Sequence, residues 1–244
     1  MDLKKYLNNS HQINGWCNPK LWNCIQPIHN YHKENNINYP IAEIGVYQGK
    51  FFCGLGAMVD KNAPHLAIDV FSLQKFNLDK AGEGNLKLFK ENLSKCDLNN
   101  VEIIEADSLT IKQSFINSKS QQYSYVSVDA CHLPEHTIND FKIAMELVIP
   151  EGIIFVDDYY NPNWPGVQEG ISKYYLNNYS NFIPFLYTCN KLFFCHYGFH
   201  KIYLDIVTKF IKNNYTDSKI KLVNRFGFDS LTVLPNNKSK TYVI

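Results

Sequence analysis

Short apolar runs alternate with longer amphipathic stretches along most of the chain, which is typical of a parallel sheet covered by helices. Five runs that each end at a polar residue are predicted to be strands: 40–45, 65–70, 101–105, 124–128 and 152–156. The stretches between them are predicted to contain helices: 49–58, 82–95, 109–117 and 134–148. This order predicts an α/β fold with helices on both faces of the sheet.

The pattern is less regular after the fifth strand. A helix is predicted over 166–178, strand material over 186–197, a second helix over 203–214 and a final strand over 229–235. We expect the last two strand segments to close one edge of the sheet.

Composition and charge exclude several classes of protein. The formal charge is +1 and basic residues are scattered, so no nucleic-acid partner is expected. The seven cysteines include no CxxC pair, which argues against a structural zinc site or a disulfide framework and favours a cytoplasmic location. No segment approaches the roughly 20 apolar residues of a membrane span, so no membrane partner is expected.

Acidic residues lie at or just past the ends of the predicted strands, where ligands of open α/β sheets bind. They are Glu43, Asp69, Asp107, Asp129, Asp157 and Asp158. Each could instead cap the following helix. The adjacent pair in IIFVDDYYN needs a compensating partner, because two neighbouring carboxylates repel each other and are costly to desolvate.

The first predicted strand runs into a tight turn in EIGVYQGKFF, where Gly45 and Gly49 allow close approach of a ligand. The turn has neither the GxGxxG pattern of dinucleotide-binding proteins nor the GxxxxGK[ST] pattern of nucleotide triphosphatases. Asp69 is placed to accept hydrogen bonds from a ribose, and Asp107 with Ser108 suits the edge of an adenine.

These features resemble the class I S-adenosylmethionine-dependent methyltransferases over about residues 38–235. The segments EIGVYQGK, VDACH and VDDYYNPNWPGVQEG are similar to the macrolide-sugar O-methyltransferases of the macrocin and mycinamicin type. The site layout of that group resembles catechol O-methyltransferase. The resemblance implies a Rossmann-like, doubly wound seven-stranded sheet with the last strand antiparallel, and methyl transfer from S-adenosyl-L-methionine.

The resemblance also implies roles for individual residues. The implied cofactor-binding residues are Glu43, Gly45, Val46, Tyr47, Gly49, Asp69, Asp107, Ser108 and Asp129. Asp129, Asp157 and Asp158 match the positions that hold Mg²⁺, which would be the missing partner of the acidic pair. Catechol methyltransferases have an amide at the position of Asp158. The alternative is a solvated acidic pair that caps the next helix.

His132 follows Asp129 by three residues and matches the position of the catalytic base. A neutral imidazole is expected to accept the proton of the acceptor hydroxyl near pH 7. His136, one turn further along the predicted helix, is interpreted as an ordinary helix residue.

Residues 1–38 are predicted to form an N-terminal cap or lid, and 39–244 the methyltransferase domain. Trp16 and Trp22 in this cap could cover the cofactor or mediate subunit contacts. A second lid is expected in the polar connection 71–84. Tyr159, Tyr160, Asn161 and Trp164 either line the acceptor pocket or pack in the core.

The sequence thus predicts a Mg²⁺-dependent O-methyltransferase that acts on a hydroxyl of a sugar or another vicinal diol. Its partner would be a small-molecule or glycan acceptor, and a homo-oligomer is compatible with the sequence. The alternatives are a metal-independent small-molecule methyltransferase and a non-catalytic cofactor-binding protein of the same fold.

Overall fold

A computed structural model of the chain describes residues 1–215 and 218–234. Pro235, the end of the predicted final strand, and the rest of the predicted domain up to residue 244 lie outside the described residues. The strands are β1 (Ile41–Ile44), β2 (His65–Asp69), β3 (Val101–Glu105), β4 (Tyr123–Val128), β5 (Val148–Val156), β6 (Phe182–Thr188), β7 (Lys191–His196), β8 (Lys219–Arg225) and β9 (Phe228–Leu234). The α-helices are α1 (Leu3–Asn9), α2 (Trp22–Glu34), α3 (Lys50–Gly56), α4 (Leu86–Lys95), α5 (Gln113–Ser118), α6 (Pro134–Leu147), α7 (Pro165–Asn177) and α8 (His200–Asn214).

The strands form one mixed sheet in the order β3-β2-β1-β4-β5-β7-β6-β9-β8. The five predicted strands β1 to β5 are all present and pair in parallel. The α/β, Rossmann-like fold is therefore confirmed. The predicted number of seven strands is wrong, because the described part of the sheet has nine.

The difference lies after β5. The predicted strand material at 186–197 is a hairpin of β6 and β7, joined at Cys189 and Asn190, whose φ angles are 48° and 71°. β7 runs antiparallel between β5 and β6, and a second hairpin, β8–β9, extends the edge. The predicted antiparallel last strand is not confirmed in detail: the seventh strand, β7, is antiparallel to both neighbours, but β9, the last described strand, pairs in parallel with β6 and antiparallel with β8.

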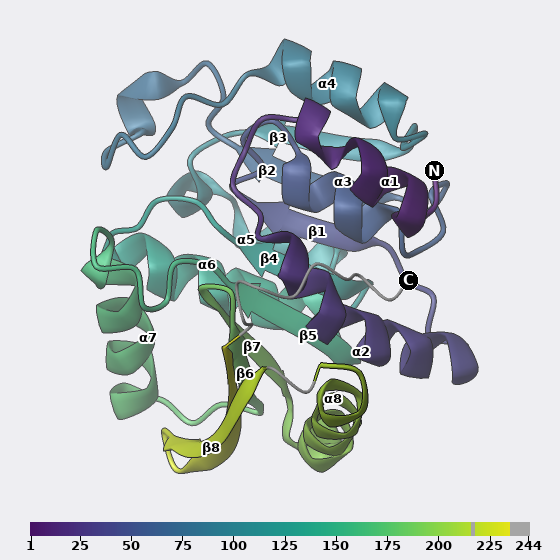
Figure 1. Ribbon diagram of the computed structural model, residues 1–244. Helices are drawn as coiled ribbons and strands as arrows, with labels where there is room; N and C mark the ends of the chain where they lie inside the picture. Colours follow the sequence, from purple (N-terminus) through teal and green to yellow (C-terminus); the bar gives the residue numbers. More distant parts are fainter. Residues whose placement is uncertain (216–217, 235–244) are drawn as a thin grey trace.

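Helices cover both faces of the sheet and create two buried cores (Figure 1). The first core joins one sheet face to α1, α2, α3, α4 and α8. The second joins the other face to α5, α6 and α7. Alternate positions of the central strands face the two cores, so that Tyr125 of β4 belongs to the first and Val126 to the second.

Two predicted helices are shorter than expected. Residues 82–85 belong to the connection after β2, because Asn85 caps α4 by accepting a hydrogen bond from Leu88 N at 3.0 Å. The segment 109–117 is divided into a 3₁₀ turn, Ser108–Thr110, and α5. Among the described residues, no helix has both the length and the apolar character needed to cross a membrane.

The carboxyl ends of β1, β2, β4 and β5 lie at one edge of the sheet, where the strand order reverses between β1 and β4. Backbone hydrogen bonds continue past these ends, from Asp129 N to Ile44 O at 2.8 Å and from Asp157 N to Val128 O at 3.0 Å. Asp129 and Asp157 are therefore held beside the switch point, where ligands of such sheets bind.

Candidate active site

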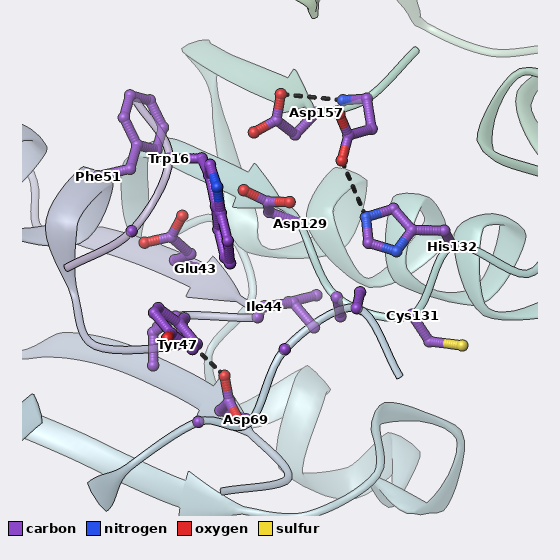
Figure 2. A pocket seen from close by; sticks show the side chains of 18 of the residues that line it. Trp16, Glu43, Ile44, Tyr47, Phe51, Asp69, Asp129, Cys131, His132 and Asp157 are labelled. Atoms are coloured by element: carbon purple, nitrogen blue, oxygen red, sulfur yellow. Dashed lines mark hydrogen bonds and ion pairs between the residues drawn. The ribbon is translucent and has the colours of Figure 1, made fainter. Parts of the chain in front are cut away.

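A cavity of about 740 Å³ opens at this edge of the sheet (Figure 2). Its wall contains all but one of the predicted site residues: Glu43, Gly45, Val46, Tyr47, Asp69, Asp107, Ser108, Asp129, His132, Asp157 and Asp158. Gly49, the remaining one, lies behind the turn, where a Cβ atom would come within 2.7 Å of the Phe89 ring. The structure thus brings the predicted residues together around one cavity.

The turn after β1 is shaped by a left-handed backbone. Gly45 and Gly49 have φ angles of +88° and +86°. A Cβ atom at Gly45 would lie 2.0 Å from the carbonyl oxygen of Asp129, so the turn and the end of β4 pack backbone against backbone. Gly45 is required both by its φ angle and by this close approach.

We expect Gly45→Ala to destabilise the fold by about 2 to 5 kcal/mol, the combined cost of a left-handed alanine and of a clash with rigid backbone. Gly227→Ala is the matched control, because Gly227 also has a positive φ (+90°) but nothing lies within 4 Å of its Cβ position. Urea unfolding of both variants measures the difference. Equal losses in the two variants would show that packing against Asp129 contributes nothing.

Asp69 joins the end of β2 to this turn. Its Oδ2 accepts a hydrogen bond from Tyr47 N and its Oδ1 accepts one from Phe71 N, both at 2.8 Å. Burial raises the pKa of Asp69, although the backbone hydrogen bonds oppose the rise. Each oxygen keeps a lone pair for a ligand in the cavity, so the side chain can both hold the turn and accept from a ribose.

The wall beyond β3 is formed by Asp107, Ser108 and His136. Asp107 Oδ1 accepts a hydrogen bond from Leu109 N at 3.1 Å and lies 3.4 Å from Nε2 of His136. Sequence reasoning missed His136 as a cavity residue. The available signal was its place in the first turn of α6, directly after the loop that carries His132.

The paired aspartates have a protein cation as a partner. Lys191, the first residue of β7, is 2% exposed; its Nζ forms an ion pair with Asp157 Oδ2 and lies 3.5 Å from Asp129 Oδ2. The same ammonium lies 4.4 Å from the centroid of the Phe51 ring. Burial alone would lower the pKa of Lys191, but Asp157, Asp129 and Glu43 outweigh burial and raise it, so the side chain is charged.

Burial and Lys191 also act, in opposite directions, on the pKa values of the neighbouring carboxylates. Burial and then Asp157 raise the pKa of Asp129, against the effect of Lys191. Burial raises the pKa of Glu43 to about 8, again against Lys191. Lys191 was not predicted as a site residue. The only indication in the sequence was a single lysine at the start of the apolar run KLFF.

His132 lies between two carboxylates. Its Nδ1 is 2.6 Å from Asp79 Oδ2, and its Nε2 is 3.0 Å from Asp158 Oδ2. Burial would lower the pKa of His132, but the contacts with Asp158 and Asp79 outweigh it and raise the pKa to about 9. The expectation of a neutral imidazole near pH 7 is therefore wrong for the protein without a bound cation.

The donor set fits a divalent cation in part. Ligand atoms of Asp129, His132 and Asp158 lie within 4.8 Å of one another. Two carboxylates suit Mg²⁺, which prefers oxygen ligands and retains several waters. The structure differs from the predicted ligand set at Asp157, because its Oδ2 faces Lys191 and its Oδ1 accepts a hydrogen bond from Asp158 N at 2.9 Å.

The predicted lids and acceptor residues have different positions. Trp16 borders the cavity, 72% exposed, with its ring 5.3 Å from that of Tyr47, whereas Trp22 is buried in the first core. Asn161 and Trp164 line the cavity, but Tyr159 is buried in the second core. Of the predicted N-terminal cap, only the short segment from Gly15 to Asn18 lies at the cavity, because α1 and α2 pack into the first core. The predicted domain boundary between residues 38 and 39 stays a prediction.

Comparison with known proteins agrees with the fold. Residues 42–159, just under half of the chain, match the family model described as a methyltransferase domain. This match agrees with the predicted resemblance to the class I S-adenosylmethionine-dependent methyltransferases. A comparison with curated protein sequences finds no match.

Solved structures similar to this chain include several O-methyltransferases. The O-methyltransferase NovP is 15% identical, with a TM-score of 0.56 over 72% of this chain and 79% of its own. CalS11, a TDP-rhamnose 3′-O-methyltransferase of calicheamicin biosynthesis, is 16% identical, with a TM-score of 0.51 over 80% and 91%. An O-methyltransferase from Bacillus cereus in complex with SAH is 13% identical, with a TM-score of 0.50 over 79% and 87%.

Proposed function

We propose that this methyltransferase is a Mg²⁺-dependent O-methyltransferase that acts on a hydroxyl of a sugar or another vicinal diol. The observation that carries the proposal is the convergence of Asp129, Asp158 and His132 in the cavity that the glycine turn and Asp69 also line. NovP and CalS11, which share the fold, are O-methyltransferases, and CalS11 acts on a sugar.

S-adenosylmethionine is the proposed cofactor and supplies an electrophilic methyl group. Asp69 would accept hydrogen bonds from its ribose, Asp107 and Ser108 would face the adenine, and the turn from Gly45 to Tyr47 would hold the methionine part with Glu43. The complex of the Bacillus cereus enzyme with SAH supports this choice. Gly45 has no space for a side chain, because a Cβ atom there would meet the backbone of Asp129.

Asp129 and Asp158 are the proposed ligands of Mg²⁺, with Asp157 held in place by Lys191. A cation bound there would lower the pKa of a coordinated hydroxyl. His132 is the proposed base, because its Nε2 faces the same space as Asp158 Oδ2 and can accept the hydroxyl proton at that atom. The stacking of Trp164 on the imidazole, with ring centroids 4.4 Å apart, limits rotation of the base.

One observation favours a second candidate, a metal-independent methyltransferase. Lys191 already gives Asp129 and Asp157 a positive partner, so these carboxylates have a structural role without a metal. In this candidate the neutral form of His132, which predominates only above its raised pKa of about 9, removes the proton without a metal, and the aspartates orient it.

The remaining proposals concern the acceptor, the cellular location and the oligomeric state. We infer a small-molecule or glycan acceptor, with no nucleic-acid or membrane partner, because the site is a cavity of about 740 Å³ on a near-neutral chain. The seven cysteines are free, which supports a cytoplasmic location. A homo-oligomer stays a prediction.

Calorimetry and turnover assays together test these proposals. The wild type should bind S-adenosylmethionine equally well with and without EDTA, and Asp69→Ala should weaken binding by about 1 to 3 kcal/mol, or about 5- to 150-fold. Methyl transfer to TDP-rhamnose or to catechol should disappear in EDTA and return with Mg²⁺.

Each other outcome rejects a specific part of the proposal. Full turnover in excess EDTA would reject the metal and favour the second candidate. Absence of cofactor binding by the wild type would reject the methyltransferase itself. An unchanged dissociation constant in Asp69→Ala would reject the ribose role.

A further inference from the structure

The connection between β2 and α4, residues 70–85, carries a buried carboxylate into the candidate active site. Asp79 lies in the middle of this polar connection, yet its side chain is only 6% exposed. Phe76, Asn77 and Gly82 of the same connection line the cavity. An acidic side chain buried in a surface connection needs compensating contacts.

Asp79 obtains two of those contacts from His132, in the loop after β4, and a third from its own connection. Its Oδ2 accepts a hydrogen bond from the backbone N–H of His132 at 2.7 Å and lies 2.6 Å from the imidazole Nδ1. Its Oδ1 accepts a hydrogen bond from Ala81 N at 3.2 Å, which fixes the carboxylate within the connection. Burial would raise the pKa of Asp79, but the hydrogen bonds from His132 lower it to about 2, so the carboxylate is ionised.

An ionised carboxylate beside Nδ1 accepts a hydrogen bond from it and has no hydrogen to donate. The hydrogen therefore stays on Nδ1, which leaves Nε2 facing Asp158 and the cavity. Trp164 covers one face of the ring, so the imidazole is held from its edge by Asp79 and from its face by an aromatic side chain. This arrangement fixes both the orientation and the protonated nitrogen of His132.

We propose that Asp79 is a positioning residue that orients His132 for proton transfer and, by the same bond, fastens residues 70–85 over the cavity. The inference rests on the proposed function of His132 as the base. It also makes closure of this connection a condition for an oriented base, because Asp79 reaches His132 only when the connection lies against the loop after β4.

Asp79→Asn and Asp79→Ala test the proposal, with Glu83→Gln as the matched control. Glu83 is an exposed acid of the same connection and does not border the cavity. We expect both Asp79 variants to lower kcat about 10- to 1,000-fold on whichever acceptor the wild type methylates. The dissociation constant of S-adenosylmethionine should change less than about threefold, and Asp79→Glu should recover part of kcat.

Two further readouts need no acceptor. In ¹⁵N-histidine-labelled protein, the hydrogen-bonded Nδ1–H proton of His132 should give a downfield resonance, identified by its loss in His132→Gln. That resonance should disappear in Asp79→Ala and persist in Glu83→Gln. Trypsin should cut at Lys75 and Lys80 several-fold faster in both Asp79 variants than in the wild type or the control.

The readouts separate failure of this inference from failure of the proposed function. An unchanged resonance and unchanged proteolysis in Asp79→Ala would overturn the inference even if the enzyme methylates sugars. Loss of the resonance and faster proteolysis, without methyl transfer by the wild type, would support the contact and reject the function. A normal kcat in both Asp79 variants of an active enzyme would overturn the positioning role.

Discussion

His132→Gln is expected to lower the turnover number by roughly 10² to 10⁴, the usual contribution of a positioned general base. Glutamine keeps a polar side chain of similar reach, but it cannot accept a proton at neutral pH. Cofactor affinity should stay within about threefold of the wild type, because the imidazole faces Asp158 rather than the glycine turn. Calorimetry and initial rates measure the two quantities separately.

The ionisation of His132 can be observed directly. Burial would lower the pKa of His132, but Asp158 and Asp79 raise it to about 9. The imidazole of the cation-free protein should therefore be protonated below that pH and neutral above it. A histidine NMR titration in EDTA should show one such group, absent in His132→Gln and present in His11→Gln, an exposed control. If His132→Gln keeps the wild-type rate, the proton leaves through another group.

Lys191→Met is expected to reduce the free energy of unfolding by about 3 to 5 kcal/mol at pH 8, since removing one partner leaves buried carboxylates without a cation. Methionine has a volume similar to that of lysine, so the loss of stability would result from removal of the charge and not from a new cavity. Burial already raises the pKa of Glu43 to about 8 and raises that of Asp129. Loss of the ammonium should raise both further.

The sign of the pH dependence follows from these raised pKa values. An acid whose pKa is higher in the folded state than in the unfolded state destabilises the fold progressively as pH rises through the range between the two values. The deficit of Lys191→Met should therefore be small near pH 5 and large near pH 8. Urea unfolding in EDTA at both pH values measures it.

Lys173→Met is the matched control, because Lys173 pairs with Glu169 on the surface of α7 with both side chains more than half exposed. Its loss should stay below about 0.5 kcal/mol at either pH. A deficit of Lys191→Met that is equally small, or that grows toward low pH, would contradict the assigned role of this lysine.

The first five strands could be predicted because each is a short apolar run with a polar residue at its end. The β6–β7 hairpin could not, because its turn at Cys189 and Asn190 has two positive φ angles but no glycine, so the sequence reads as one continuous strand. β8, KIKLVNR, lies at an edge with mostly exposed side chains, and its weak apolar pattern gave no strand signal.

The acidic side of the site could be predicted for a related reason. Strand ends fix the positions of Asp69, Asp129 and Asp158, and parallel pairing brings such ends to one edge. Lys191 and Asp79 could not be predicted, because their places depend on a reversed strand and on the path of a long connection. Neither feature has a local periodicity.

The insertion of β7 between β5 and β6 has a consequence for any shortened version of this protein. A fragment ending near residue 159, where the family match ends, would contain every predicted carboxylate but would lack Lys191. It would also leave β5 as a bare edge, with the backbone groups from Ile153 to Val156 no longer paired to β7. Such a fragment combines unneutralised buried acids with an exposed apolar edge strand, and we expect it to aggregate rather than fold.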